Sequence, residues 1–518
     1  MKNFNDFFAN LLGKDGKRAV PQPHAGRRPI ERVKPALGAE RMAGVPYKRG
    51  DFIGKDYEVC GLLGQGGFGV VYLAYSHRGD AVFALKTFRD EYLQDTKSIE
   101  HFRKEAQVWV DLERHPHLVQ AWFVDEIAGR LYIGMEYIAP DDEGVNSLEG
   151  HLERRPPDLA QSLLWAIQFC HGMEYAYSHG IRAHRDVKPA NILISQGQSV
   201  KISDFGLAGV LGSARREKGI SLGVQQGRVG LSCTLDGAGF GTPTHMPPEQ
   251  FTNASDCDER SDIYAFGIVL YQMATAGKLP FLAPLPRDRS EEEMARFWRN
   301  MHSLHSKSPV PSVDSPLFPV IERCLRKQPG KRCQTFVELR NELEPLLRRE
   351  TGEVIKPPEL QELEAWEWGN KAFSVFTLGH FEEAIRCCDR ALELGPREAM
   401  AWNIRGASLD SLGRLNEAVR CYDRALELDP KLAMAWFNKG LYLDRLGRLG
   451  EALRCYEKAV VLVPRDAQAW IRKASVEEKL GRRREAAHSY KRFIALAPGQ
   501  YPDHLELALQ RLRELGGR

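Results

Sequence analysis

The stretch HRDVKPAN, residues 184–191, governs the interpretation of the chain because it places three polar side chains within six residues. They are Asp186, Lys188 and Asn191. Thirteen residues after the last of these, the tripeptide DFG adds the carboxylate of Asp204. Far upstream, the apolar strand-like run VFALK ends in Lys86, and the helical periodicity of IEHFRKEAQVWVDL predicts that Glu105 faces inward. These side chains are the candidates for chemistry, and the surrounding motifs indicate which chemistry it is.

A glycine-rich stretch precedes Lys86. LLGQGGFGVVYLA contains G-x-G-x-x-G at Gly64, Gly66 and Gly69, followed by Val70. A dinucleotide-binding motif of this form would open a helix, but an extended β-branched and aromatic run, VVYLAYS, follows here. The glycine loop is therefore predicted to join two antiparallel strands, and its missing side chains let backbone amides approach phosphates.

Further motifs follow in a fixed order: GTPTHMPPE with Glu249, SDIYAFG with Asp262 and PGKRC with Arg332. The ordered set resembles a eukaryotic-type serine/threonine protein kinase over residues 57–345. A lysine two residues after Asp186 is similar to serine/threonine kinases rather than to tyrosine kinases. The resemblance implies a bilobal α+β fold, and the domain spans 51–350, with a small lobe at 51–138 and a large lobe at 139–350.

The same resemblance implies four catalytic residues. Asp186 would accept or orient the proton of the substrate hydroxyl, and Lys188 would steady the γ-phosphate. Lys86 would hold the α- and β-phosphates, with Glu105 orienting it through an ion pair. A buried structural carboxylate is the plain alternative for Asp186, and a solvated strand lysine is the alternative for Lys86.

ATP is the cofactor that the resemblance implies. Asn191 and Asp204 would coordinate Mg²⁺, with Mn²⁺ as an alternative, because their oxygens suit a hard cation. Met135 stands at the gatekeeper position, and Glu136 and Ile138 would offer backbone hydrogen bonds to adenine. The full predicted ATP-binding set is Leu63, Gly64, Gly66, Gly69, Val70, Ala84, Lys86, Met135, Glu136, Ile138, Asn191 and Asp204.

Several motif residues are predicted to support the fold. Glu249 should pair with Arg332, and Asp262 should brace the catalytic loop from a buried helix. Trp109, one helical turn after Glu105, stands where the family usually has a smaller aliphatic residue. Its expected neighbour, Ala121, is unusually small, which indicates that the two positions have exchanged volume. His184 and Phe205 are predicted to be core spine residues rather than chemical ones.

The segment from the DFG aspartate to the PPE glutamate spans 46 residues, and His245 replaces its usual tyrosine. Autophosphorylation at Ser232 or Thr234 would order this loop through the neighbouring arginine of HRD. A mobile insertion with incidental serines is the alternative. Thr242 is expected to hydrogen-bond the catalytic aspartate instead.

The C-terminal part carries a period of 34 residues. The period links Gly379, Gly413, Gly447 and Gly481, then Pro396, Pro430, Pro464 and Pro498, and also Trp368, Trp402, Trp436 and Trp470. It resembles the tetratricopeptide repeat (TPR) in four copies over 365–500, after a linker at 351–364 and before a capping helix at 501–518. The first copy departs from the pattern, with Ala372 where later copies have Gly406 and Gly440, and Cys388 where they carry Tyr422 and Tyr456.

Such repeats form a groove that binds a peptide or protein. Met400, Asn403, Met434, Phe437 and Leu441 are predicted to face the concave side. That lining lacks the lysine and asparagine set with which some TPRs clamp a terminal carboxylate. A groove that folds back on the kinase, or that self-associates, remains an alternative.

Composition bounds the remaining partners. Hydrophobic residues make up 43% and the net charge is +3, so nucleic acid is not an expected partner. Residues 1–50 carry 11 Lys/Arg and 4 Asp/Glu. This basic tail is predicted to be mostly disordered, with one short amphipathic helix. Peripheral contact of the tail with a membrane surface therefore stays open. No transmembrane segment or signal peptide is expected, and the scattered cysteines favour the cytoplasm.

The function predicted from these features is transfer of the ATP γ-phosphate to Ser/Thr hydroxyls of a protein substrate, with the TPR module recruiting that substrate or a regulator. The alternative is a TPR-based scaffold in which the kinase domain is regulatory or secondary. A catalytically dead kinase would lack Lys86, Asp186 or Asp204, and all three are present.

Overall fold

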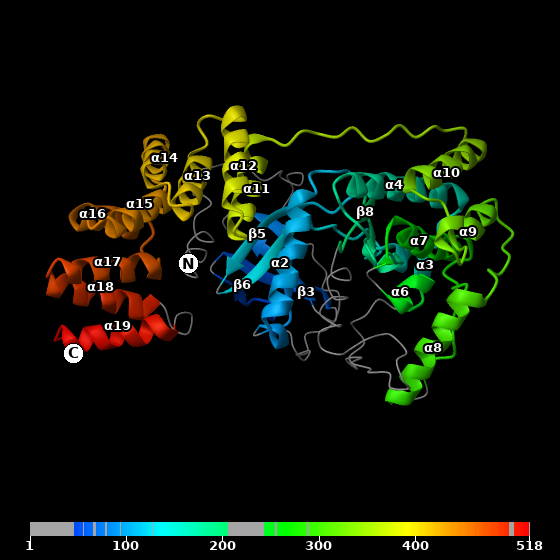
Figure 1. Ribbon diagram of the computed structural model, residues 1–518, viewed down its shortest axis with the longest axis horizontal. Helices are drawn as coiled ribbons and strands as arrows, with labels where there is room; N and C mark the ends of the chain where they lie inside the picture. The colour runs from blue at the N-terminus through cyan, green and yellow to red at the C-terminus, as the bar shows by residue number, and fades with distance from the viewer. Residues whose placement is uncertain are drawn as a thin grey trace.

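The computed structural model describes residues 46–54, 56–65, 69–77, 80–93, 95–127, 129–205, 243–253, 256–286, 290–496 and 502–516. A lobe with a β-sheet lies at the centre of Figure 1, a helical lobe lies on one side of it, and stacked helix pairs lie on the other. The predicted architecture, a bilobal α+β unit followed by an all-α repeat solenoid, is confirmed.

The first lobe is built on a six-stranded antiparallel sheet in the order β1-β2-β3-β4-β6-β5. Its strands are β1 (Phe52–Ile53), β2 (Tyr57–Gln65), β3 (Gly69–Ser76), β4 (Ala81–Phe88), β5 (Ala121–Ile127) and β6 (Arg130–Met135). The antiparallel pairing of β2 with β3 confirms that the glycine-rich loop joins two such strands. Helix α2 (Thr96–Asp111) packs on β5 and β6 through a face spaced by three and four residues, including Ala106, Trp109 and Val110.

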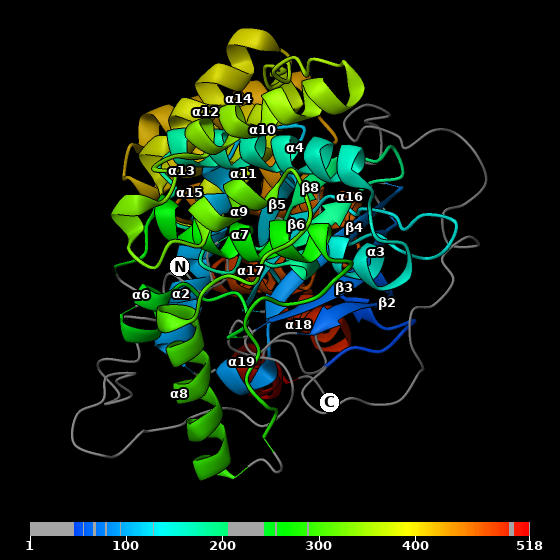
Figure 2. The same ribbon diagram turned by 90° about the vertical axis from the view of Figure 1, so that its right-hand side faces the viewer.

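The second lobe is helical, with a small hairpin on the side that faces the sheet. Its elements are α3 (Leu148–Arg154), α4 (Leu159–Ser178), β7 (Ile192–Ile194), β8 (Val200–Ile202), α6 (Pro248–Thr252), α7 (Glu259–Ala274), α8 (Glu291–Lys307), α9 (Phe318–Cys324) and α10 (Phe336–Thr351). The run from Ile263 to Met273 in α7 is buried without interruption, which explains why this stretch is apolar on all sides. Helix α8 extends away from the lobe in both Figure 1 and Figure 2.

An extended connection without helix or strand runs from α10 along the top of Figure 1 to the repeats. The repeat helices are α11 (Ala365–Thr377), α12 (Phe381–Leu394), α13 (Ala399–Ser411), α14 (Leu415–Leu428), α15 (Ala433–Arg445), α16 (Leu449–Leu462), α17 (Ala467–Lys479) and α18 (Arg483–Leu496), followed by α19 (Pro502–Glu514). All four periodic glycines have φ between 73° and 90° in the turns within the pairs, a conformation that glycine adopts at low cost. Among the described residues, no helix is both long and apolar enough to cross a membrane.

The first repeat differs from the second and third at two positions that face each other. A Cβ atom added at Gly406 would lie 2.8 Å from the ring of Tyr422, and one at Gly440 would lie 2.8 Å from the ring of Tyr456. In the first repeat the corresponding ring is replaced by Cys388, and the Cβ of Ala372 is accommodated with both residues fully buried. In the second and third repeats the glycine and the facing tyrosine are therefore sterically coupled, whereas the fourth repeat buries Ala474 together with Tyr490 in one cluster.

This coupling predicts the outcome of a double-mutant cycle. Gly406→Ala alone should destabilise the repeats by about 1–3 kcal/mol, because the new methyl group overpacks against Tyr422. In a Tyr422→Cys background the same change should become neutral, or stabilising by up to about 1 kcal/mol, because alanine is the better helix former. Urea unfolding followed by tryptophan fluorescence measures the change in the free energy of unfolding that Gly406→Ala causes in each background. An equal loss of stability in the two backgrounds would contradict the coupling.

Candidate active site

Lys86 is the charged centre of the site. Strand β4 carries it into the interior, where it is 2% exposed, and its Nζ donates to Glu105 Oε1 at 2.6 Å and to Asp204 Oδ1 at 2.8 Å. Burial by itself would lower the pKa of Lys86, but the two carboxylates outweigh burial and raise that pKa above its usual value. Burial likewise opposes ionisation of Asp204, yet the charge of Lys86 dominates and lowers the pKa of the carboxyl. The amine therefore stays charged and draws α2 and the DFG segment together.

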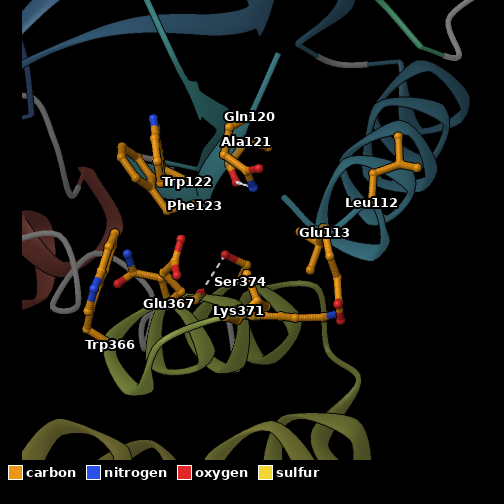
Figure 3. A pocket seen from close by; sticks show the side chains of 13 residues that line it. Leu112, Glu113, Gln120, Ala121, Trp122, Phe123, Trp366, Glu367, Lys371 and Ser374 are labelled. Carbon is orange, nitrogen blue, oxygen red and sulfur yellow. Dashed lines mark hydrogen bonds and ion pairs between the residues drawn. The ribbon is translucent and has the colours of Figure 1, made fainter. Parts of the chain in front are cut away.

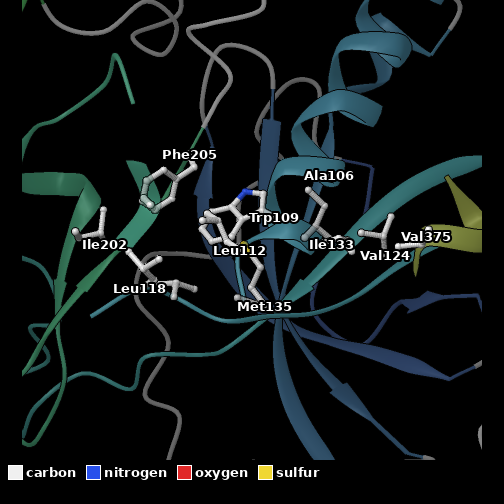
Figure 4. Close-up of a cluster of buried hydrophobic side chains, with 14 of the residues drawn as sticks. Ala106, Trp109, Leu112, Leu118, Val124, Ile133, Met135, Ile202, Phe205 and Val375 are labelled. Atoms are coloured by element: carbon white, nitrogen blue, oxygen red, sulfur yellow. The ribbon is translucent and has the colours of Figure 1, made fainter. Parts of the chain in front are cut away.

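The helix that carries Glu105 also contacts the DFG segment through Trp109. The indole lies edge-on to the ring of Phe205, with centroids 5.5 Å apart, and the ring centroid of His184 lies 4.7 Å from that of Phe205. Figure 4 shows Trp109 next to Phe205 in the buried cluster that joins the two lobes. Helix α2 and the DFG segment are thus packed against each other.

The catalytic loop brings the predicted residues together. Lys188 Nζ lies 2.8 Å from Asp186 Oδ2, and Asn191 Nδ2 donates to the same oxygen at 2.9 Å. The backbone amide of Ser203 donates to the Asn191 carbonyl at 3.0 Å, which brings Asn191 beside Asp204. The loop therefore presents one carboxylate, one amine and one amide on a common side.

Two residues of this loop system adopt left-handed backbone conformations that non-glycine residues avoid. Arg185 has φ 65° and Asp204 has φ 62°, which costs of order 1–3 kcal/mol each. The buried carboxylate of Asp262 fixes the first of them, since it accepts from the backbone amides of Arg185 at 2.8 Å and His184 at 2.5 Å. The Tyr177 hydroxyl also donates to Asp262. The predicted brace is present, and the tyrosine is a partner that no sequence motif indicated.

The second predicted support is also present. Arg332 is 1% exposed and donates to both oxygens of Glu249, at 2.6 and 2.9 Å. Its remaining donors reach the carbonyl groups of Arg260, Arg326 and Lys327. This fully satisfied cation ties the PPE segment to the helices behind it.

The predicted adenine-side residues lie where β6 leaves the sheet. Met135 pairs with Ala84 across β4 and β6 and is 6% exposed. The carbonyl of Ile138 accepts from Asn146 at 2.7 Å, and the side chain of Glu136 pairs with Lys201 at 2.9 Å, a contact the sequence did not indicate. These contacts fix the segment between the two lobes.

On the glycine-loop side, Val70 is buried and Leu63 is 41% exposed. A Cβ at Gly64 would meet nothing within 4 Å, while one at Gly69 would lie 3.2 Å from the Thr87 carbonyl. Open space above Gly64 agrees with a loop that can approach a ligand. Four predicted residues lie outside the described residues: Gly66, Ser232, Thr234 and Thr242.

The residues present fit a nucleotide with a divalent cation. The Asp204 side chain is 40% exposed although Lys86 holds one of its oxygens, so a carboxylate oxygen remains open beside Asn191. Across the described ranges, no three His, Cys, Asp or Glu side chains cluster as a self-sufficient metal site. A cation here would take its other ligands from phosphates and water, as Mg²⁺ usually does.

The comparisons with known proteins bear on this geometry. The model of the protein kinase domain matches residues 57–342, more than half of the chain. The chain belongs to the protein kinase family. Models of the tetratricopeptide repeat match residues 399–432, 433–466 and 467–500, and these ranges begin after α11 and α12.

The curated relatives are serine/threonine-protein kinases. The chain is 32% identical to PknB of Mycolicibacterium smegmatis over 297 residues, which are 55% of this chain and 42% of the relative. It is 31% identical to PknB of Mycobacterium tuberculosis over 313 residues, 58% of this chain and 44% of that one. It is 33% identical to pkn3 of Myxococcus xanthus over 312 residues, which are 57% of this chain and 51% of that relative. The matches therefore span about half the length of these relatives.

His245, which replaces the usual tyrosine of this kinase domain, is partly buried, and both of its ring nitrogens have hydrogen-bond partners. Its Nε2 lies 2.7 Å from Gln272 Oε1 and its Nδ1 lies 3.0 Å from the Thr244 hydroxyl. Burial lowers the pKa of His245 from 6.5 to about 4. The unfolded chain therefore binds a proton below pH 6.5 that the folded chain does not bind until about pH 4.

His245 should for this reason make the domain acid-labile. As pH falls from 6.5 towards 4, wild type should lose about 1.4 kcal/mol of stability per pH unit from this group relative to His245→Tyr. Chemical denaturation of both proteins from pH 8 to pH 5 measures the difference, and the value at pH 8 removes the contribution of packing. A difference that does not change with pH would contradict a neutral histidine at this position.

Proposed function

We propose that this protein is an ATP-dependent serine/threonine protein kinase that transfers the γ-phosphate to Ser or Thr hydroxyls of protein substrates. The observation that carries the proposal is the position of Lys86 between Glu105 and Asp204, at 2.6 and 2.8 Å. This arrangement keeps an ammonium group charged beneath the glycine loop, where phosphates would need neutralisation.

Phosphoryl transfer requires the protein to position the reactants and to stabilise charge, and it requires little covalent chemistry from the protein itself. Lys86 would bind the α- and β-phosphates, and Glu105 would hold it in place. Asp186 would accept or orient the proton of the substrate hydroxyl, while Lys188, 2.8 Å from it, would steady the γ-phosphate.

Asn191 and Asp204 would hold Mg²⁺, or Mn²⁺ in its place. The cation, when bound, supplies positive charge that offsets the charge developing on the phosphates. The side-chain amide nitrogen of Asn191 also donates to the carboxylate of Asp186 at 2.9 Å. Asn191 would therefore both position the catalytic carboxylate and bind the cation.

For the repeats we propose recruitment of a substrate or regulator as a peptide or protein, with the scaffold function as the alternative. Of the residues predicted to line the groove, Asn403, Met434 and Phe437 are buried, while Met400 and Leu441 are half-buried. Binding would therefore rely on the partly exposed positions. The cytoplasm is the proposed location, because each of the cysteines that the structure describes is free.

Asp186→Asn in the full chain should abolish transfer of radiolabel from ATP to protein substrates, lowering kcat by about 10³-fold or more, because the acceptor hydroxyl loses its base.

Leu441→Glu, in the groove of the repeats, should behave differently. It should reduce labelling of proteins in a cell extract while leaving kcat for a short serine peptide unchanged, since Leu441 lies on α15, which contributes no residue to the active site described above.

The matched control is Val461→Glu, which places the same charge on a side chain of the same repeat that is already 73% exposed. It should alter neither readout. Full activity of Asp186→Asn would refute the kinase assignment. Extract labelling that is equal for Leu441→Glu and Val461→Glu would refute recruitment through this groove and favour the scaffold alternative.

A further inference from the structure

Strand β5 forms one edge of the small-lobe sheet. An edge strand leaves backbone amides and carbonyls without ladder partners, and proteins cover such edges. Here helix α11 of the first repeat supplies the cover. The backbone amide of Val124 donates to the hydroxyl of Ser374 at 2.9 Å, between residues 250 positions apart in sequence, and Ser374 is 1% exposed.

The contact extends along the helix and is well filled. Figure 3 shows Trp366 and Ser374 of α11 directed towards Trp122 and its neighbours on β5, and the two indoles stack with centroids 6.0 Å apart. Val375 belongs to the same buried cluster as Val124. A partly open pocket of about 30 Å³ lies between helix and strand.

The same helix also reaches the middle of α2 and the segment just past its C-terminal end. Arg103, within α2, donates to the carbonyl of Thr377 at 3.3 Å, and Glu113, two residues past the end of α2, pairs with Lys371 at 3.0 Å. Helix α2 carries Glu105, the partner of Lys86, and Trp109, the partner of Phe205. Contacts with α11 therefore bear on the element that assembles the active site.

These contacts are particular to the first repeat. The Ser374 hydroxyl donates to the Asn370 carbonyl within α11 at 2.8 Å, and the equally buried Ser408, one period of 34 residues later, makes the matching bond to the Ile404 carbonyl at 2.9 Å. Ser374 differs because its oxygen also accepts from the backbone amide of Val124. One period after Lys371 lies Arg405, which pairs with Asp389 of the preceding helix inside the solenoid. Ser374 and Lys371 therefore make contacts with the small lobe that replace or add to the contacts their counterparts make inside the solenoid.

From this geometry we infer that α11 is a positioning element of the kinase active site. It holds β5 and α2 from outside, so that Glu105 stays on Lys86. The first repeat therefore packs as a part of the small lobe. The rest of the solenoid is connected through it to the Lys86–Glu105 pair. Ser374 and Lys371 act through α2 and do not touch substrate.

The test compares Ser374→Ala with Ser408→Ala in the full chain. Ser374→Ala leaves the buried Val124 amide without an acceptor, so hydrogen exchange in β5 should accelerate about tenfold. Exchange in α2 should accelerate with it, kcat for a short peptide should fall severalfold and KM for ATP should rise. Ser408→Ala should change none of these, because its hydroxyl serves only its own helix.

A charge exchange provides an independent readout. Lys371→Glu should lower kcat/KM for ATP severalfold by placing two carboxylates together, and adding Glu113→Lys should restore it. A purely local packing role would show no such rescue.

Equal exchange in Ser374→Ala and Ser408→Ala would overturn the docking itself. Faster exchange in β5 with unchanged exchange in α2 and unchanged kinetics would overturn the positioning role. If no variant and no wild-type protein transferred phosphate, the proposed function would fail, while the exchange comparison between the two alanine variants would still decide whether α11 holds α2.

Discussion

One buried ammonium group organises the kinase lobe. Lys86 is almost fully enclosed, and an enclosed charge is tolerable only when partners of opposite charge surround it. Its partners come from two other elements, α2 and the DFG segment, so satisfying Lys86 requires both to be in place at once. Trp109 and Phe205 pack where these elements meet, and Asp262 fixes the strained loop that carries Asp186.

Because α2 must lie close to Lys86, whatever restrains α2 also affects the chemistry. The large lobe restrains it through Phe205, and the first repeat restrains it from the opposite side through Arg103 and Glu113. One continuous cluster of buried side chains runs from both kinase lobes into the repeats, as far as Val476 of α17. The extended connection from α10 to α11 lets the chain return from the far lobe to this edge of the sheet.

Sequence patterns predicted a large part of this arrangement. The position of Lys86 on a strand and of Glu105 on an inward helix face followed from periodicity, and the glycine spacing of 34 predicted the helix pairs. These features are local or strictly periodic. The Glu249–Arg332 and Asp262 contacts are long-range, and they were predictable only because the motifs occur in a known order.

What the sequence could not predict is contact between modules. Ser374 and Val124 are 250 residues apart, and a serine within a repeat helix carries no sign of an external partner. The atypical first repeat was a signal, yet Ala372 with Cys388 is explained by packing inside the repeat. The stacking of Trp122 on Trp366 and the Tyr177 bond to Asp262 depend on tertiary placement in the same way.

The central claim, that the Lys86–Glu105 pair joins the position of α2 to catalysis, is tested most directly by the steady-state kinetics of Glu105→Gln. The substitution keeps the shape of the side chain and removes its charge, so Lys86 retains only Asp204. Loss of one partner of a buried pair typically costs about 3–5 kcal/mol. Expressed in the transition state, that cost corresponds to a fall in kcat/KM for ATP of about 10²–10⁴-fold with the secondary structure intact. Near wild-type kinetics in a folded Glu105→Gln protein would contradict the account.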